Sequence, residues 1–222
     1  EISACLVGSE MCIRDSLEVN RRSAQEMAKL SASIESLAAY LEKEKIAHGD
    51  FQTGNLMVSD GGATVQLIDY DGMFVDEIDT LGSSELGHVN FQHPLRQKTN
   101  PFNHTLDRFS LISLWLALKS LQIDPSIWDK SNSELDAIVF RANDFVDPGS
   151  SSILGMLSGI QQLSTFIKNF AAICASAMEK TPSLGDFIAG RNIPLSLTSV
   201  SMNGDIPVSY THLRAHETGR NL

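Results

Sequence analysis

The segment from Phe109 to Leu121 constrains the fold more than any other part of the chain. Apart from three serines and Lys119, every residue in it is apolar. A helix that is apolar on most of its faces has to be enclosed by other elements of the protein. We therefore expect a central buried helix here, with the rest of the chain packed around it.

Two further patterns precede this helix. Between Ser23 and Glu44, apolar residues recur at steps of three and four among Lys, Glu and Ser, which predicts an amphipathic helix. The short apolar runs 55–58 and 65–69 are separated by the turn-forming sequence 59–62, which is typical of a β-hairpin. The expected fold class is α+β, mainly α, with a small β-hairpin.

Less regular segments follow the hairpin. Residues 72–103 have little periodicity and many Gly, Asn, His and Pro residues, so we expect a long ordered loop of functional importance. Further helices are expected at 134–141 and at about 159–180, with Pro182 and Gly185 marking the end of the last one.

Both ends of the chain have an unusual relationship at the level of DNA. One DNA sequence can encode Val208–Thr218 (VSYTHLRAHET), and its complementary strand can encode Leu6–Asp15 (LVGSEMCIRD). Both peptides resemble translated adapter sequence of the kind used to prepare sequencing libraries. We therefore expect residues 1–16 and 208–222 to be non-native, adapter-like flanks.

Composition limits the classes of partner. Seventeen basic and twenty-seven acidic residues give a formal net charge of -10, which argues against a broad electrostatic contact with nucleic acid or with an anionic membrane. The sequence has no apolar run of about 18 residues and no secretion signal. We expect a cytoplasmic protein with neither nucleic acid nor membrane as a partner.

The residues with the clearest chemical signal lie around the hairpin. Asp50 and Asn55 stand in the sequence HGDFQTGN, on a loop that leads into the first strand, and Asp69 ends the second strand. Phosphoryl transfer needs an acceptor for the proton of the attacking hydroxyl and oxygen ligands for magnesium. Hairpin pairing can bring Asn55 and Asp69 together around one ion. The alternative is that these residues only cap turns, as Asp and Asn often do.

At these positions the sequence resembles the protein-kinase-like superfamily. His48, Asp50 and Asn55 match the catalytic loop H-R-D-x-x-x-x-N, and Asp69 matches the Asp of the metal-binding D-F-G turn. The family contains a C-terminal lobe of mainly helical structure. By this resemblance, Asp50 orients the attacking hydroxyl and accepts its proton, while Asn55 and Asp69 bind Mg²⁺ against the phosphates of ATP.

Two segments further along extend the resemblance. Residues 87–94 (GHVNFQHP) resemble the segment that closes the activation loop, and 107–111 (DRFSL) resemble the start of the family's central buried helix. The sequences of these motifs are most similar to those of a group of bacterial kinase-like proteins. By the resemblance His48 and Asp107 have structural roles, with Asp107 accepting hydrogen bonds from the backbone of the catalytic loop.

The resemblance gives a map of the chain. The N-terminal lobe, with its Gly-rich loop and strand Lys, cannot be placed in this sequence. The expected parts are a C-terminal lobe (17–185) that contains the catalytic loop (48–55), metal turn (69–72), activation-type loop (73–94) and buried helix (107–121), followed by a linker (186–207).

Several positions depart from the family pattern. Gly49 replaces the usual Arg, Gln52 replaces the Lys that steadies the transferred phosphoryl group, and Leu95 replaces a structural Glu. We expect a bacterial Ser/Thr protein-kinase-like phosphotransferase, which as this fragment is inactive alone. The alternatives are a small-molecule phosphotransferase of the aminoglycoside or sugar type and a pseudokinase scaffold. The acceptor is thus a hydroxyl of either a protein or a small molecule.

Overall fold

The computed structural model describes residues 10–76, 86–99, 101–131 and 136–195. Its fold is α+β and mainly helical, with one small antiparallel sheet, which confirms the expected fold class at this level. The helices are α1 (Ile13–Asn20), α2 (Ala24–Glu44), α3 (Arg96–Thr99), α4 (Arg108–Ile123), α5 (Ile127–Lys130), α6 (Ala142–Val146), α7 (Ser152–Ser158), α8 (Ser164–Cys174) and α9 (Leu184–Ile188). The strands are β1 (Met11–Cys12), β2 (Leu56–Ser59) and β3 (Thr64–Leu67).

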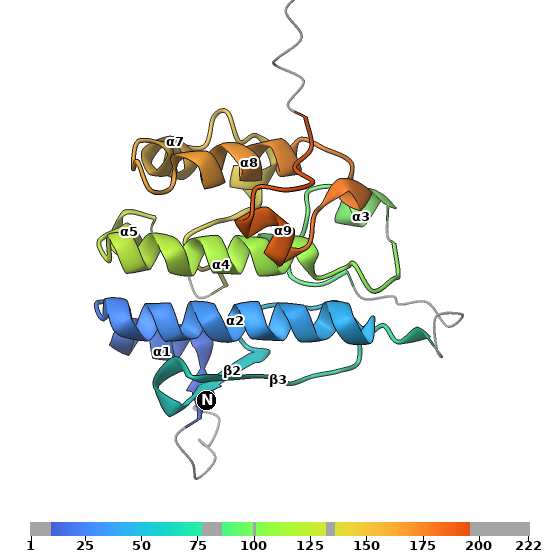
Figure 1. The fold of residues 1–222 in the computed structure, drawn as a ribbon, viewed down its shortest axis with the longest axis horizontal. Coiled ribbons are helices and arrows are strands. Elements are labelled where there is room, and N and C mark those ends of the chain that lie inside the picture. The colour runs from blue at the N-terminus through green and yellow to red at the C-terminus, as the bar shows by residue number, and fades with distance from the viewer. Residues whose placement is uncertain (1–9, 77–85, 100, 132–135, 196–222) are drawn as a thin grey trace, which may run out of the picture.

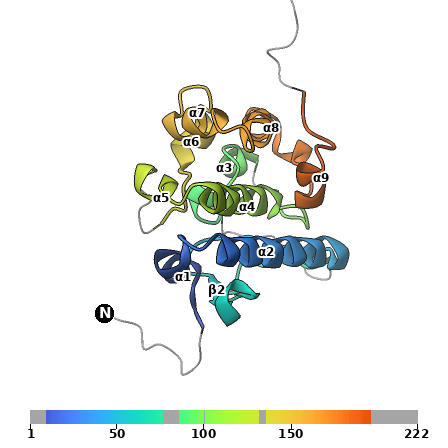
Figure 2. The same ribbon diagram turned by 60° about the vertical axis from the view of Figure 1, so that its left-hand side comes forward.

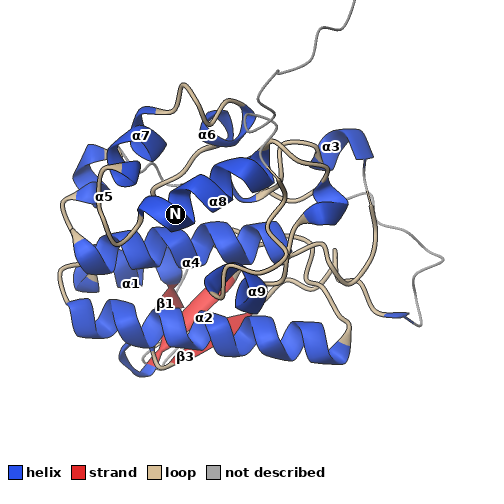
Figure 3. Cartoon of the chain, turned by 45° about the horizontal axis from the view of Figure 1, so that its top comes forward, coloured by secondary structure: helices blue, strands red, loops and turns tan. Residues whose placement is uncertain are grey.

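The elements lie in layers around the two longest helices. Helices α2 and α4 pack side by side, the sheet lies on the far side of α2, and α7 and α8 lie on the far side of α4 (Figures 1 and 2). Helix α9 contacts both α2 and α4 (Figure 3). The α4 helix is therefore enclosed by other elements.

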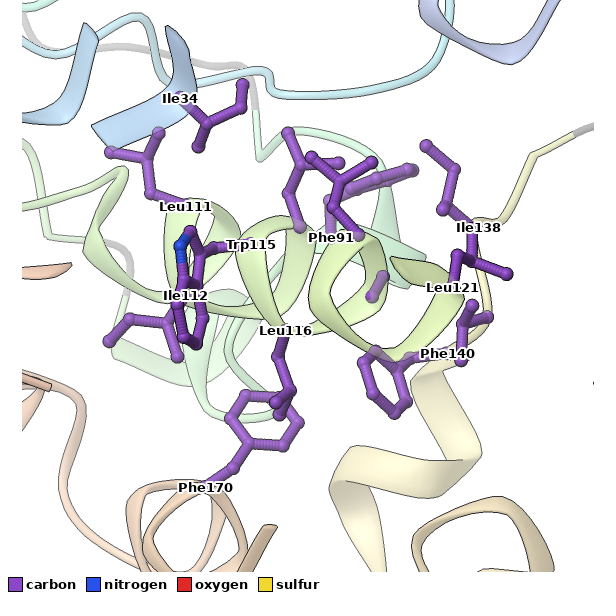
Figure 4. Close-up of a cluster of buried hydrophobic side chains, with 14 of the residues drawn as sticks. Ile34, Phe91, Leu111, Ile112, Trp115, Leu116, Leu121, Ile138, Phe140 and Phe170 are labelled. Atoms are coloured by element: carbon purple, nitrogen blue, oxygen red, sulfur yellow. The ribbon is translucent and has the colours of Figure 1, made fainter. Parts of the chain in front are cut away.

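The burial of α4 confirms the prediction from its sequence. Ile112, Leu116 and Leu121 have no exposed surface, and the aromatic ring of Phe170 from α8 lies next to Leu116 (Figure 4). Burying a large aliphatic side chain of this kind contributes about 2 kcal/mol. Helix α4 ends at Ile123, just before the sequence Asp124-Pro125, because a proline restricts the residue before it to extended backbone.

Helix α2 occupies the range predicted from its periodicity. At its start the Ser23 hydroxyl accepts a hydrogen bond from the Glu26 backbone N–H at 3.2 Å, which satisfies one of the free N–H groups of the first turn. Its buried face includes Ile34 and Leu41, and it ends where Lys45 adopts a left-handed conformation. The chain then enters the loop that carries His48 and Asp50.

The predicted hairpin is also present. Strands β2 and β3 are antiparallel, with Leu56 opposite Leu67 and Ser59 opposite Thr64, and the turn between them is Asp60–Gly62. Strand β1 pairs with the other edge of β2. In this structure Ile13, from the segment predicted to be an adapter-like flank, is fully buried.

One predicted helix is wrong. Residues 136–141 are not helical, and residues 132–135 lie outside the described part of the chain. The four consecutive side chains of residues 137–140 are all buried, so this segment has no exposed face of the kind a surface helix presents. Val139 has a positive φ, and Ile138 forms an isolated bridge with Phe140.

The last predicted helix is shorter than expected, and the chain continues to fold beyond it. Helix α8 covers only residues 164–174 of the predicted range 159–180, and a 3-10 turn at Met178–Lys180 follows it. A separate helix, α7, ends just before this range. After Pro182 the chain forms α9, which includes residues 186–188 of the segment predicted as a linker. Phe187 in this helix is fully buried.

The predicted long loop is described in part. Residues 86–99 contain a single 3-10 turn at Val89–Phe91 and the short helix α3, while residues 77–85 and 100 lie outside the described part. Among the described residues, no helix is both long enough and apolar enough to cross a membrane.

Candidate functional site

A buried carboxylate holds the loop after α2. Asp107, which is 3% exposed at the start of α4, accepts hydrogen bonds from the backbone N–H of His48 at 2.5 Å and of Gly49 at 2.9 Å. These are the contacts expected for Asp107 from the sequence. They join the loop to the central helix across more than fifty residues of chain.

Burial disfavours the charged form of Asp107. Loss of solvent raises the pKa of Asp107 to about 6, although the two backbone hydrogen bonds and the positive charge of Arg96 act in the opposite direction. Arg96 itself is 1% exposed, and burial lowers its pKa. Its guanidinium donates a hydrogen bond to the Pro101 carbonyl at 2.6 Å. An acidic and a basic group are thus buried together beneath the loop.

His48 links the same loop to the end of the hairpin. Its ring is fully buried, and its Nε2 lies 2.9 Å from the carbonyl oxygen of Ile68. Because a carbonyl oxygen only accepts, Nε2 carries the proton and donates it. The ring also makes edge contacts with Phe51 and Tyr70. His48 therefore ties the loop after α2 to the end of β3.

The turn that follows β3 is held from two sides. Ala47 and Phe74 exchange backbone hydrogen bonds of 3.1 and 2.7 Å beyond the turn, and His48 holds Ile68 before it. Between these points Gly49 has a φ of +83°, and a Cβ atom there would lie 2.6 Å from the Gly72 carbonyl oxygen. Only glycine allows the loop and the turn to approach this closely.

Asp50 lies at the centre of a set of hydrogen-bond donors. Its Oδ2 accepts from the side-chain amides of Gln52 and, at 3.0 Å, of Asn55. Its Oδ1 accepts from the backbone N–H of His88 at 3.0 Å. A carboxylate has about four lone-pair positions, so these three donors leave one position open, on Oδ1. The carboxylate is half-buried.

Asn55 and Asp69 lie at the same end of the hairpin. The Ile68 backbone N–H donates to the Asn55 carbonyl at 3.1 Å, which places Asp69 directly after the residue paired with Asn55. Asn55 is 7% exposed and donates its side-chain N–H groups to Asp50, so its Oδ1 is the atom left to bind a cation. Asp69 is exposed and has a φ of +65°.

Asn55 and Asp69 are the residues of this region that could take part in binding a divalent ion. Within the described ranges there is no group of three or more His, Cys, Asp or Glu residues able to hold a metal ion. Mg²⁺ is commonly bound by one or two protein carboxylates together with waters and substrate phosphates. Asp69 and the Oδ1 of Asn55 offer this kind of partial site.

Residues 87–94 (GHVNFQHP), called the closing segment below, pack against the loop that carries Asp50. Gln92 is buried and donates its side-chain amide to the Gly49 carbonyl at 3.3 Å. Gly87 has a φ of +69°, and a Cβ atom there would lie 2.7 Å from the Gly49 carbonyl oxygen. Ser110 of α4 donates its hydroxyl to the Phe91 carbonyl at 2.7 Å. The segment is therefore fixed to both the loop and the central helix.

His93 in this segment is a packing residue. It is 2% exposed, its Nδ1 accepts from the Leu95 N–H at 3.1 Å, and its Nε2 donates to the Ile173 carbonyl at 3.2 Å. Burial lowers the pKa of His93, so the ring is neutral at pH 7. Both ring nitrogens are occupied, and His93 is not available to bind a metal ion.

A cavity of about 180 Å³ lies beside the closing segment. Its walls come from Gly87, Val89 and Pro94 on one side and from Phe145 and Val146 of α6 on the other. Val89 and Val146 are 46% and 70% exposed at its edge. The lining is mainly apolar, which suits an apolar side chain of a binding partner.

Sequence reasoning did not identify several residues that hold the site. Arg108 of α4 donates to both carboxylate oxygens of Glu42 in α2, at 2.6 and 2.8 Å, and so fixes the helix next to Asp107. Arg96 and the amide of His88 were also not expected at the site. A backbone donor has no signal in the sequence, and the pair Glu42 and Arg108 is separated by 66 residues.

Comparison with known proteins adds no family to this description. The chain matches no protein-family model, and no curated protein is significantly similar to it.

Proposed function

We propose that this chain belongs to the catalytic lobe of a bacterial protein-kinase-like enzyme that transfers the γ-phosphoryl group of ATP to a hydroxyl. The observation that carries the proposal is the hydrogen bond from Asn55 to Asp50, together with the backbone bond that pairs Asn55 with Ile68, the residue before Asp69. These residues come from a loop and from both sides of a hairpin, and backbone contacts to Asp107 and Ile68 hold the loop in place.

Each residue has a role that its contacts support. Asp50 orients the acceptor hydroxyl and takes its proton, while the hydroxyl oxygen bonds to the γ-phosphorus and the bond from that phosphorus to the leaving oxygen of ADP breaks. Asn55 and Asp69 would hold Mg²⁺. When bound there, the ion would supply positive charge to neutralise the phosphates of ATP. His48 and Asp107 position the loop that carries Asp50.

The proposal includes a second lobe outside this chain. Asp69 and Tyr70 are exposed, and no Gly-rich phosphate loop or strand Lys that could cover the nucleotide on that side can be placed in the sequence. In protein kinases these two parts bind the phosphates of ATP. We expect the present chain to be inactive alone, and the cytoplasm, which contains ATP and Mg²⁺, to be the site of action of the full-length protein.

A protein is the acceptor that the surface favours. The apolar cavity next to the closing segment can take a side chain of a bound polypeptide, and the closing segment contacts Asp50 through His88. The second candidate is a small-molecule phosphotransferase, favoured by the absence of a cation at residues 49 and 52. A pseudokinase scaffold would bind nucleotide without turnover.

The experiment compares two aspartate variants of the full-length protein with Mg²⁺ and radiolabelled ATP. Asp50→Asn should lower the rate of phosphoryl transfer by about 100-fold or more, since general-base catalysis contributes about that much. The control is Asp60→Asn, at an exposed position in the hairpin turn, which should retain the wild-type rate. Screening protein, sugar and antibiotic acceptors separates the two candidates, and equal rates in both variants would contradict the role of Asp50.

A further inference from the structure

The side chain of Gln52 has one polar contact that its place in the motif does not predict. Its amide nitrogen donates a hydrogen bond to the same oxygen of Asp50 that accepts from Asn55. The residue is half-buried at the start of the turn that leads into β2. An amide is neutral, so Gln52 adds no positive charge to the site, and its donor group is occupied by Asp50.

Because both side-chain amides donate to Oδ2, the two carboxylate oxygens of Asp50 differ in their number of hydrogen-bond donors. Oδ2 is filled by Gln52 and Asn55, whereas Oδ1 has a single donor among the residues that the structure describes, the N–H of His88. Since each carboxylate oxygen has about two lone pairs, only Oδ1 can still accept a proton or a hydroxyl hydrogen bond. The orientation of Asp50 thus decides where an acceptor hydroxyl can stand.

We propose that Gln52 is a positioning residue for Asp50, which together with Asn55 turns the carboxylate so that Oδ1 faces the acceptor hydroxyl. This inference rests on the proposed function for its catalytic consequence. The hydrogen bond from Gln52 gives Oδ2 a second side-chain donor beside Asn55 and so restricts rotation of the carboxylate. Asn55 alone holds Oδ2 by one side-chain contact, and its nitrogen is shared with the Asp50 backbone carbonyl at 3.1 Å.

Two substitutions separate positioning from packing. Gln52→Met keeps most of the side-chain volume and removes the donor, whereas Gln52→Glu keeps the shape and places a second carboxylate against Asp50. A positioning role predicts that Gln52→Glu is the more harmful, because like charges repel at hydrogen-bond distance. A space-filling role predicts that the isosteric Gln52→Glu is the milder. The matched control is Gln66→Met, at an exposed position in β3.

The first readout does not depend on activity. In two-dimensional NMR spectra of the 222-residue chain, Gln52→Met should shift the His88 backbone amide and the Asn55 side-chain amide, because both donate to Asp50. Gln66→Met should leave both signals in place. If Gln52→Met also leaves both signals in place, the contact between Gln52 and Asp50 does not position the carboxylate and the inference is overturned.

The second readout is the steady-state kinetics of the full-length protein with Mg²⁺ and ATP. Gln52→Met should lower kcat by about 10- to 100-fold, as expected for a misplaced catalytic group, with KM for ATP within about twofold of wild type. Gln52→Glu should lower kcat further. If both variants keep the wild-type kcat, the positioning role is wrong although the enzyme assignment stands. If the wild type transfers no phosphate, the proposed function fails, and the NMR result alone decides whether Gln52 orients Asp50.

Discussion

Replacing Gly49 by alanine tests the close packing of the loop against the turn after β3. At this position φ is +83°, and an added Cβ would lie 2.6 Å from the Gly72 carbonyl oxygen, where ordinary contacts begin at 3.4 Å. The left-handed conformation costs an L-residue about 1 to 2 kcal/mol. Moving the turn away by about 0.8 Å adds a cost of similar size, as overpacking does in cores. We expect Gly49→Ala to lower the free energy of unfolding by about 2 to 4 kcal/mol.

A control with the same chemical change lies five residues further along. Gly54 has a negative φ, and a Cβ added there would meet nothing within 4 Å, so Gly54→Ala should change stability by less than about 0.5 kcal/mol. The assay is urea unfolding of the chain followed by circular dichroism. With a slope of about 2 kcal/mol per molar urea, the Gly49→Ala midpoint should fall by about 1 to 2 M. Equal midpoints for the two variants would refute the packing of Gly49 against Gly72.

Three further predictions concern buried groups. Burial raises the pKa of Asp107 from 3.8 to about 6, so between these pH values the folded state binds a proton that the unfolded state releases. Between pH 4 and 6 the contribution of Asp107 to the free energy of unfolding should therefore fall as pH rises, by up to about 1.4 kcal/mol per pH unit. Urea titrations at several pH values should show this slope in the wild type and not in Asp107→Asn. Cys174 is 5% exposed, and its burial strongly raises the pKa of its thiol. The thiol should therefore resist alkylation in the folded chain and react in urea, which site-resolved mass spectrometry can measure. Rapid labelling of the folded chain would contradict the burial of Cys174. Leu116→Ala should lower the free energy of unfolding by about 2 to 5 kcal/mol, because Leu116 is fully enclosed between α4 and its neighbours, whereas a loss below about 1 kcal/mol would mean that the helix is not central.

The sequence was sufficient where residues repeat with a clear period. Helix α2 was predicted because its apolar residues follow helical steps, and the hairpin was predicted because a turn sequence separates two short apolar runs. Helix α4 was predicted because it is apolar on nearly every face. For α2 and the hairpin the period is a direct consequence of which faces the element buries, whereas for α4 the apolar run itself indicates an enclosed helix.

The same reasoning failed where burial does not follow a period. In residues 137–140 every side chain is buried, so the pattern of apolar residues does not distinguish a helix from an extended segment. Helix α9 begins after Pro182 and contains Gly185, two residues that normally indicate the end of a helix. Its burial against α2 and α4 outweighs that local signal.

The residues of the candidate site were named before the structure, but apart from the contacts of Asp107 the hydrogen bonds that hold them were not. Asp50, Asn55, Asp69 and Asp107 were named from spacing and from the resemblance. The His88 amide reaches Asp50 across 38 residues, and the Gln52 side chain reaches it across two. Both contacts depend on how the backbone of an irregular loop folds. The spacing of residues in the sequence does not predict that path.

The most direct test of the proposed site is to locate by NMR where a divalent ion binds in the presence of nucleotide. Mn²⁺ can replace Mg²⁺ at oxygen sites and broadens the NMR signals of nearby nuclei. In the full-length protein with ATP, Mn²⁺ should broaden the signals of Asn55 and Asp69 first, and Asp69→Asn should abolish this selectivity while Asp60→Asn should not. Broadening that is independent of ATP, or that is centred on other aspartates, would contradict a phosphotransfer site at Asp50, Asn55 and Asp69.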